Sequence, residues 1–129
     1  MIRRGLAWLP ALAWAGVIYF VSAQPKEAFV RFGLSGALLP IAGHLITYAV
    51  LMVLLVIALR VGGRLPVEQS CVVAFLLVAL FGLSDEYHQS FVPGRTATMW
   101  DWLVDLLGAG LAWLAINRWN GQAHQKPPG

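Results

Sequence analysis

The chain has 129 residues, of which 59% are hydrophobic and only 12% are charged, with a formal net charge of +3. This composition excludes an ordinary soluble domain of this size and predicts a protein embedded in lipid. The basic residues stand singly between apolar runs, which argues against nucleic-acid binding and makes membrane lipids the expected partners. Because Cys71 is the only cysteine, the chain has no internal disulfide and no cysteine-rich zinc site.

Four apolar runs predict four transmembrane helices, because about 20 residues in a helix cross the hydrocarbon core of a bilayer. The expected helices span residues 6–23, 41–60, 67–88 and 99–117. Pro10 is compatible with the first helix, since neighbouring groups in a membrane bundle can satisfy the freed backbone. The sequence therefore predicts one all-α, four-helix transmembrane domain over residues 1–118 and a flexible cytoplasmic tail over residues 119–129.

The first apolar run also fits a cleavable signal peptide. Arg3 and Arg4 precede it, and Val21, Ser22 and Ala23 close it, which is the plan of such a peptide. Both interpretations remain open on the sequence. The sides assigned to the later helices are the same in either case, because the second helix would still run from outside to inside.

Lysines and arginines in the short loops predict how the helices are oriented. One side of the predicted membrane has Arg3, Arg4, Arg60, Arg64, Arg118 and Lys126, and the other has Lys26, Arg31 and Arg95. Cytoplasmic loops carry the excess of basic residues, so both termini are expected in the cytoplasm. Residues 26–40, between the first two helices, are expected to form a loop or a short helix in the outer interface.

Polar residues recur at helical spacing on the predicted helices. The second helix has His44 and Tyr48. The third has Gly82, either Asp85 or Glu86, and Gln89. The fourth has Asp101, Asp105 and Gly108. Each helix therefore has one polar stripe. Because successive helices alternate in direction, the stripes are expected to meet at the extracytoplasmic face, where Tyr19 and Ser22 join them. A shared polar site is predicted there.

The fourth predicted helix has a charged face and a small-residue face. Asp105 lies one turn deeper than Asp101, and an unpaired charge at the middle of a transmembrane helix costs about 2.5 to 3.5 kcal/mol on insertion scales. Arg95 is its expected counter-ion, since a guanidinium group can clamp a carboxylate or a phosphate. Gly108 and Ala112 are four residues apart and predict close packing against a neighbouring helix.

The third predicted helix contains two adjacent carboxylates that diverge by about 100°. Glu86 is expected on the face of Gln89 and inside the site, whereas Asp85 is expected to pair with Arg95 or to cap the helix. His88 falls between these faces and is expected to face solvent.

One set of motifs extends over most of the chain. It comprises Ser22-Ala23-Gln24-Pro25, His44, Tyr48, Asp85-Glu86-x-x-Gln89, Pro93-Gly94-Arg95, Asp101 and Gly108. This pattern resembles the VanZ-like family of small bacterial membrane proteins. The resemblance implies a multi-pass protein of the bacterial cytoplasmic membrane that acts at the cell envelope, because the family's namesake is associated with resistance to the glycopeptide teicoplanin. It implies no established reaction.

Two interpretations of the shared site remain open. In the first, the site binds a lipid-linked cell-wall precursor or a glycopeptide through His44, Tyr48, Asp85, Glu86, Gln89, Arg95, Asp101 and Asp105. In the second, the protein is an enzyme that acts on a phosphate-containing envelope lipid. The candidate catalytic residues, and the candidate ligands of a divalent metal, are then His44, Glu86 and Asp101, with Asp85 or Asp105 as a further member. Arg95 would hold the phosphate. A transporter is a weaker third interpretation, and the sequence leaves a homo-oligomer open.

Overall fold

The computed structural model describes residues 2–33, 36 and 38–125, and this part of the chain is helical without strands. Its helices are α1 (Ile2–Leu6), α2 (Leu9–Ser22), α3 (Lys26–Arg31), α4 (Leu38–Val61), α5 (Val67–Gln89) and α6 (Met99–Gln125). Four segments are long and apolar enough to cross a membrane, namely Arg4–Ser22, Leu38–Val61, Val67–Gln89 and Met99–Ala123. The predicted all-α architecture with four membrane-spanning helices is therefore confirmed.

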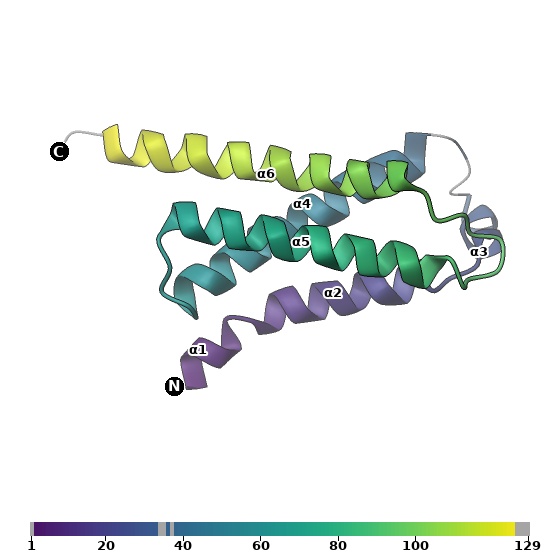
Figure 1. The fold of residues 1–129 in the computed structure, drawn as a ribbon, viewed down its shortest axis with the longest axis horizontal. Helices are drawn as coiled ribbons and strands as arrows, with labels where there is room; N and C mark the ends of the chain where they lie inside the picture. The colour runs from purple at the N-terminus through teal and green to yellow at the C-terminus, as the bar shows by residue number, and fades with distance from the viewer. Residues whose placement is uncertain (1, 34–35, 37, 126–129) are drawn as a thin grey trace.

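The long helices form one bundle. Helix α4 packs on both α5 and α6, which pack on each other, and α2 lies against α4 and α5. Two tryptophans connect neighbouring helices, because the Nε1–H of Trp14 donates to the backbone oxygen of Thr47 at 2.9 Å and that of Trp102 donates to Ala79 at 3.0 Å. Helix α3 and the α5–α6 loop lie at one end, which we call the α3 end, and α1 and the last turns of α6 lie at the opposite end (Figure 1).

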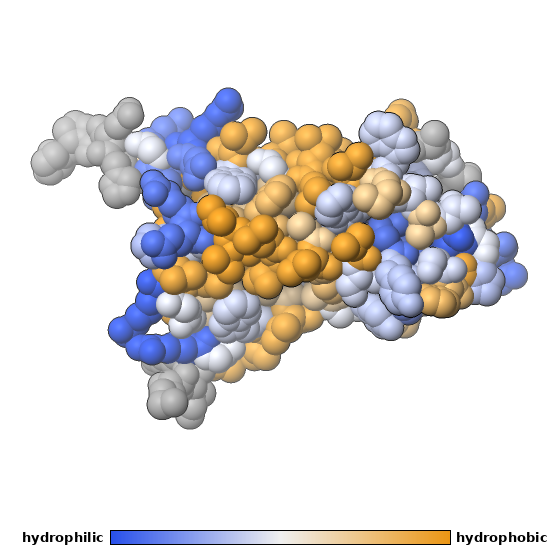
Figure 2. All heavy atoms as spheres, viewed as in Figure 1, coloured by the Kyte–Doolittle hydropathy of each residue, from blue (hydrophilic) through white to orange (hydrophobic). Residues whose placement is uncertain are grey.

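The surface of the bundle is suited to lipid. Large apolar side chains on all four long helices remain exposed, among them Phe20, Leu76, Leu80 and Leu114. Figure 2 shows hydrophobic residues across the middle of the molecule and hydrophilic residues at both ends. An apolar band between two polar ends is the pattern that a membrane-spanning bundle requires.

Glycine and alanine allow α4 and α6 to approach each other closely. A Cβ atom added at Gly108 would overlap the backbone oxygen of Leu45, whereas one added at Gly110 would meet nothing within 4 Å. Ala109 and Ala112 are buried. The small-residue face predicted for the fourth helix is therefore at a helix contact, and it brings the start of α6 against the start of α4.

The helix ends differ from the prediction at two places. Helix α6 continues to Gln125, so residues 119–125 are helical where a flexible tail was expected. No proline occurs between Met99 and Pro127, and Gly121 costs only about 1 kcal/mol. Residues 126–129 of that tail lie outside the described residues. The first predicted helix is interrupted between α1 and α2, next to Pro10, which lacks the N–H that a continuous helix would need there.

Candidate functional site: a buried polar cluster at the α3 end

Polar side chains from four helices meet inside the α3 end of the bundle. The buried ones are Ser22 of α2, Tyr48 of α4, Asp85, Glu86 and Gln89 of α5, and Asp105 of α6, each no more than 6% exposed. His44 of α4 is partly buried beside them. We call this group, with His44, the polar cluster. Buried polar groups are stable only when they have partners, so their hydrogen bonds indicate how the cluster is built.

Asp85 accepts hydrogen bonds from three helices. Its Oδ2 atom accepts from Ser22 Oγ at 2.7 Å, from Gln89 Nε2 at 3.0 Å and from Tyr48 Oη at 3.3 Å. Asp85 was expected to pair with Arg95 or to cap a helix, and it has neither role in the structure. Asp85 instead lies on the face of Gln89 that was assigned to Glu86, and it connects α2, α4 and α5.

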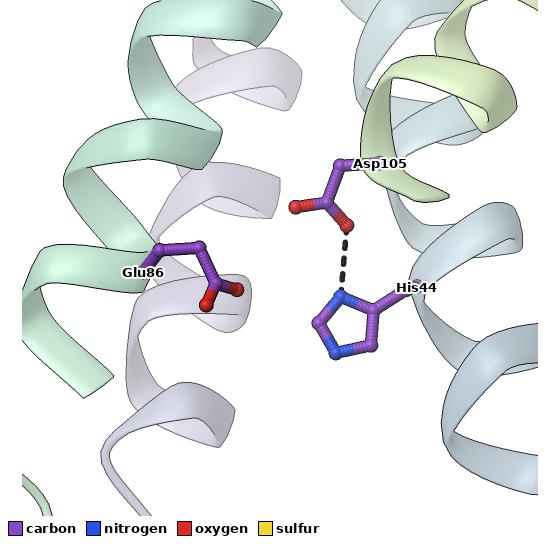
Figure 3. Close-up of side chains that lie close together, drawn as sticks. All are labelled: His44, Glu86 and Asp105. Carbon is purple, nitrogen blue, oxygen red and sulfur yellow. Dashed lines mark hydrogen bonds and ion pairs between the residues drawn. The ribbon is translucent and has the colours of Figure 1, made fainter. Parts of the chain in front are cut away.

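Asp105 pairs with His44. Their Oδ1 and Nδ1 atoms are 2.8 Å apart (Figure 3), and this is the one ion pair within the described residues. The expected counter-ion, Arg95, does not contact Asp105. An ionised carboxylate only accepts hydrogen bonds, so His44 donates to it from Nδ1 in that state. The pair joins α4 to α6 directly beside the close approach at Gly108.

Glu86 lies on a different face of α5 from Asp85 and is directed toward the start of α6. Its Oε2 atom accepts the backbone N–H of Thr98 at 3.1 Å. Thr98 and Asp101 form a local capping arrangement, because Thr98 Oγ1 donates to Asp101 Oδ2 at 2.8 Å and accepts the N–H of Asp101 at 3.3 Å. Asp101 therefore stabilises the start of α6 and makes no hydrogen bond with the polar cluster.

His44, Glu86 and Asp105 come together as a group that could hold a metal ion. Each offers one ligand atom, and these atoms all lie within 4.8 Å of one another. Asp101 was expected in this group and Asp105 only as a further member, but the structure has Asp105 there. The two aspartates are one turn apart on the same face of α6, so spacing alone does not distinguish them. Gly82 on α5 leaves room for the Asp105 side chain, because a Cβ atom added at Gly82 would lie only 3.3 Å from Asp105 Oδ2.

Two basic side chains at the α3 end contact aromatic rings. The guanidinium carbon of Arg95 is 5.0 Å from the centroid of the Phe29 ring, in a cation–π contact. The His88 ring packs against Tyr19 at a tilt, with ring centroids 4.2 Å apart, so His88 is partly covered instead of facing solvent as expected. The roles of Phe29 and Thr98 were missed in the sequence, although the Thr98-x-x-Asp101 spacing is a capping signal.

Several buried atoms of this region lack hydrogen-bond partners. Within the described residues they are Asp85 Oδ1, Glu86 Oε1, Asp105 Oδ2, His88 Nε2 and Arg95 Nε. Three are carboxylate oxygens that accept hydrogen bonds or bind cations, and Arg95 Nε is a donor. Buried polar atoms normally have partners. The five atoms without partners are concentrated at the α3 end of the bundle, and this end is therefore the candidate ligand site.

Comparison with known families supports the fold and places the cluster within it. A family model described as VanZ/LLP1 matches residues 7–120. No curated protein and no solved structure gives a significant match to the chain. The matched range contains the whole polar cluster, from Ser22 to Asp105, and confirms the resemblance that the motifs indicated. The chain belongs to the VanZ/LLP1 family.

Proposed function

We propose that this protein binds the polar headgroup of a lipid-linked envelope molecule in the polar cluster. In this proposal the chain spans the bacterial cytoplasmic membrane, both termini are cytoplasmic, and the α3 end faces outward. The observation that carries the proposal is the set of five buried polar atoms that have no hydrogen-bond partner among the described residues. A bound headgroup would supply those partners, and its removal would leave them unsatisfied, at about 1 to 3 kcal/mol for each buried group.

The types of unpartnered atom indicate the chemistry of the ligand. The oxygens of Asp85, Glu86 and Asp105 favour hydroxyl or amine donors, or a cation, whereas the nitrogens of Arg95 and His88 suit a phosphate oxygen. A sugar phosphate carried on a lipid contains both kinds of group. Such a headgroup is also the shared feature of lipid-linked cell-wall precursors, which connects the proposal with an envelope role.

The surface beside the cluster suits the hydrocarbon part of such a ligand. Tyr87 and Phe91 are each 70% exposed and pack against each other edge to face, with ring centroids 5.1 Å apart. They follow Glu86 at the end of α5. A lipid lying on this aromatic pair would have its headgroup beside Arg95 and the carboxylates, at the depth where aromatic side chains prefer the membrane interface.

A second function, catalysis, is favoured by the His44–Asp105 pair. An imidazole held by a carboxylate can accept and return a proton, and Glu86 supplies another carboxylate beside it. In this version the same headgroup is hydrolysed or transferred at its phosphate. The two functions differ in one observable, because a binding protein returns the lipid unchanged and an enzyme yields product.

Titration of the purified full-length chain in detergent with undecaprenyl phosphate, followed by native mass spectrometry, tests both functions. We expect a saturable complex that is weakened about tenfold or more in Arg95→Ala, since a hydrogen bond to a charged group contributes about 1.5 to 3 kcal/mol. Arg64→Ala, an exposed arginine at the opposite end, is the matched control and should bind as the wild type does. Equal affinity in Arg95→Ala would contradict the proposal, and new product masses would favour the enzyme.

A further inference from the structure

We infer that His44, Glu86 and Asp105 bind one divalent transition-metal ion, an inference that rests on the proposed function for the role of that ion. The ion would lie between α4, α5 and α6 and would present its open positions to the headgroup. The ligand set differs from the one expected from the sequence, because Asp105 takes the place of Asp101.

The distances fit a metal ion. Zinc binds histidine nitrogen and carboxylate oxygen at about 2.0 to 2.2 Å, so two ligand atoms on opposite sides of one ion are at most about 4.4 Å apart. The candidate atoms of His44, Glu86 and Asp105 lie within 4.8 Å of one another. Small side-chain rotations would therefore bring them into coordination without moving a helix.

The two carboxylates are buried and have an oxygen available. Asp105 is 1% exposed and Glu86 is 6% exposed, and Asp105 Oδ2 and Glu86 Oε1 have no hydrogen-bond partner in the part of the chain that the structure describes. Figure 3 shows both carboxylates and the His44 ring directed toward the same space between the helices. These unsatisfied oxygens are independent of the clustering itself, and they are available to bind a cation.

The charge balance of the cluster also favours a cation. Asp85, Glu86 and Asp105 are all buried, and His44 is their one ion-pair partner in the described part of the chain. The guanidinium group of Arg95 lies on Phe29 instead of on a carboxylate. A divalent ion would offset two negative charges in a region of low dielectric, where uncompensated carboxylates are costly.

The donor set selects the kind of ion. One imidazole and two carboxylates suit zinc or manganese, whereas calcium and magnesium prefer sites made entirely of oxygen. Asp85 is not a ligand in this assignment, because its Oδ2 atom already accepts three hydrogen bonds. Three protein ligands leave at least one position for water or for a phosphate oxygen, as in catalytic zinc sites.

Metal binding by the purified full-length chain, in detergent and without added lipid, tests the inference. After equilibration with Mn²⁺, we expect about one ion per chain by elemental analysis, and a pulsed electron paramagnetic resonance spectrum with nitrogen coupling from the imidazole. Glu86→Gln, Asp105→Asn and His44→Gln should each weaken Mn²⁺ binding about tenfold or more, because losing even an outer-shell partner typically costs that much. Nitrogen coupling should disappear in His44→Gln.

Two control variants make the result specific. Glu68→Gln removes an exposed carboxylate at the start of α5 and should keep the affinity of the wild type. Asp101→Asn separates the two ligand sets, and it should weaken Mn²⁺ binding much less than Asp105→Asn does. The wild-type measurement does not depend on whether the variants fold. If the wild-type chain binds no Mn²⁺, or binds it without nitrogen coupling, the inference is overturned. Equal loss in Asp101→Asn and Asp105→Asn overturns the ligand assignment. Because lipid is absent, failure here is separate from failure to bind undecaprenyl phosphate.

Discussion

His44 Nδ1 and Asp105 Oδ1 lie 2.8 Å apart, although 61 positions separate the two residues in the chain. The contact forms where α4 and α6 approach most closely, because Leu45 follows His44 and its backbone oxygen lies against Gly108, one turn beyond Asp105. Helix packing and site geometry therefore depend on the same few residues. A substitution that separates the two helices should also separate the members of the polar cluster.

Gly108→Ala should destabilise the bundle by about 1 to 3 kcal/mol, the usual cost of overpacking. The added methyl group would overlap the Leu45 backbone oxygen and push α6 away from α4. Unfolding can be followed by heating the protein in detergent with a thiol-reactive fluorogenic dye, since Cys71 is free, buried and the chain's one cysteine. The midpoint should fall in Gly108→Ala.

Gly110→Ala is the matched control for that measurement. It lies two residues further along the same helix, and an added Cβ there would meet nothing within 4 Å. Replacing a glycine by alanine in a helix gains about 0.5 to 1 kcal/mol, so this variant should be as stable as the wild type or more so. Similar loss in both variants would show that the α4–α6 contact is not the cause.

Asp105→Ala should lower stability by about 1 to 3 kcal/mol, because it leaves the partly buried His44 without its acceptor. Asp105→Asn should cost less, since an amide oxygen still accepts a hydrogen bond from the imidazole. Thermal unfolding with the Cys71 dye assay, in buffer that contains a chelator, compares the two without any contribution from bound metal. Equal midpoints for Asp105→Ala and the wild type would mean that the pair adds nothing to stability.

Much of this architecture could be predicted from the sequence. The apolar runs give the four spans because hydrophobic length is a strong constraint in membranes. The alternating direction of the helices correctly brings His44, Asp85, Glu86 and Asp105 to one end. Gly108 was identified as a packing position because it lies four residues from Ala112, and small residues at that spacing let a neighbouring helix approach closely.

The pairing inside the site could not be predicted, because it depends on how each helix is rotated. Arg95 and His44 were both near Asp105 by topology, and the close approach of α4 and α6 favours His44. Asp85 and Glu86 diverge on α5, yet both are buried, since α2 and α4 cover one side and α6 covers the other. Side-chain periodicity gives the face of a helix and not the identity of the neighbour on it.

Ser22→Ala should lower stability by about 0.5 to 1.5 kcal/mol, because the shortest hydrogen bond to Asp85 is lost. Ser90→Ala is a suitable control, since Ser90 Oγ is exposed and donates to the backbone oxygen of Tyr87 three residues away.

The hydrogen bond between Ser22 and Asp85 also bears on the signal-peptide interpretation. Cleavage after Ala23 would remove Ser22, so we expect the intact mass of the membrane-extracted protein to retain α2.

Cysteine labelling in intact cells should place the α3 end outside. Lys26→Cys and Thr96→Cys, both exposed positions at this end, would be introduced separately into a Cys71→Ala background, with Arg64→Cys at the opposite end as the control. An impermeant thiol reagent should label the first two and spare the third until the cells are opened. Labelling of Arg64→Cys alone would place the polar cluster at the cytoplasmic face.

The central claim is that the polar cluster receives the headgroup of an envelope lipid, and photo-crosslinking tests it most directly. A polyprenyl phosphate with a photoreactive group next to its phosphate would be activated in membranes that contain the protein, and crosslinked peptides would be mapped by mass spectrometry. We expect crosslinks at Arg95, Tyr87 and Phe91, and we expect unlabelled undecaprenyl phosphate to suppress them. Crosslinks confined to the apolar hollow that Arg60 and Trp119 line would contradict it.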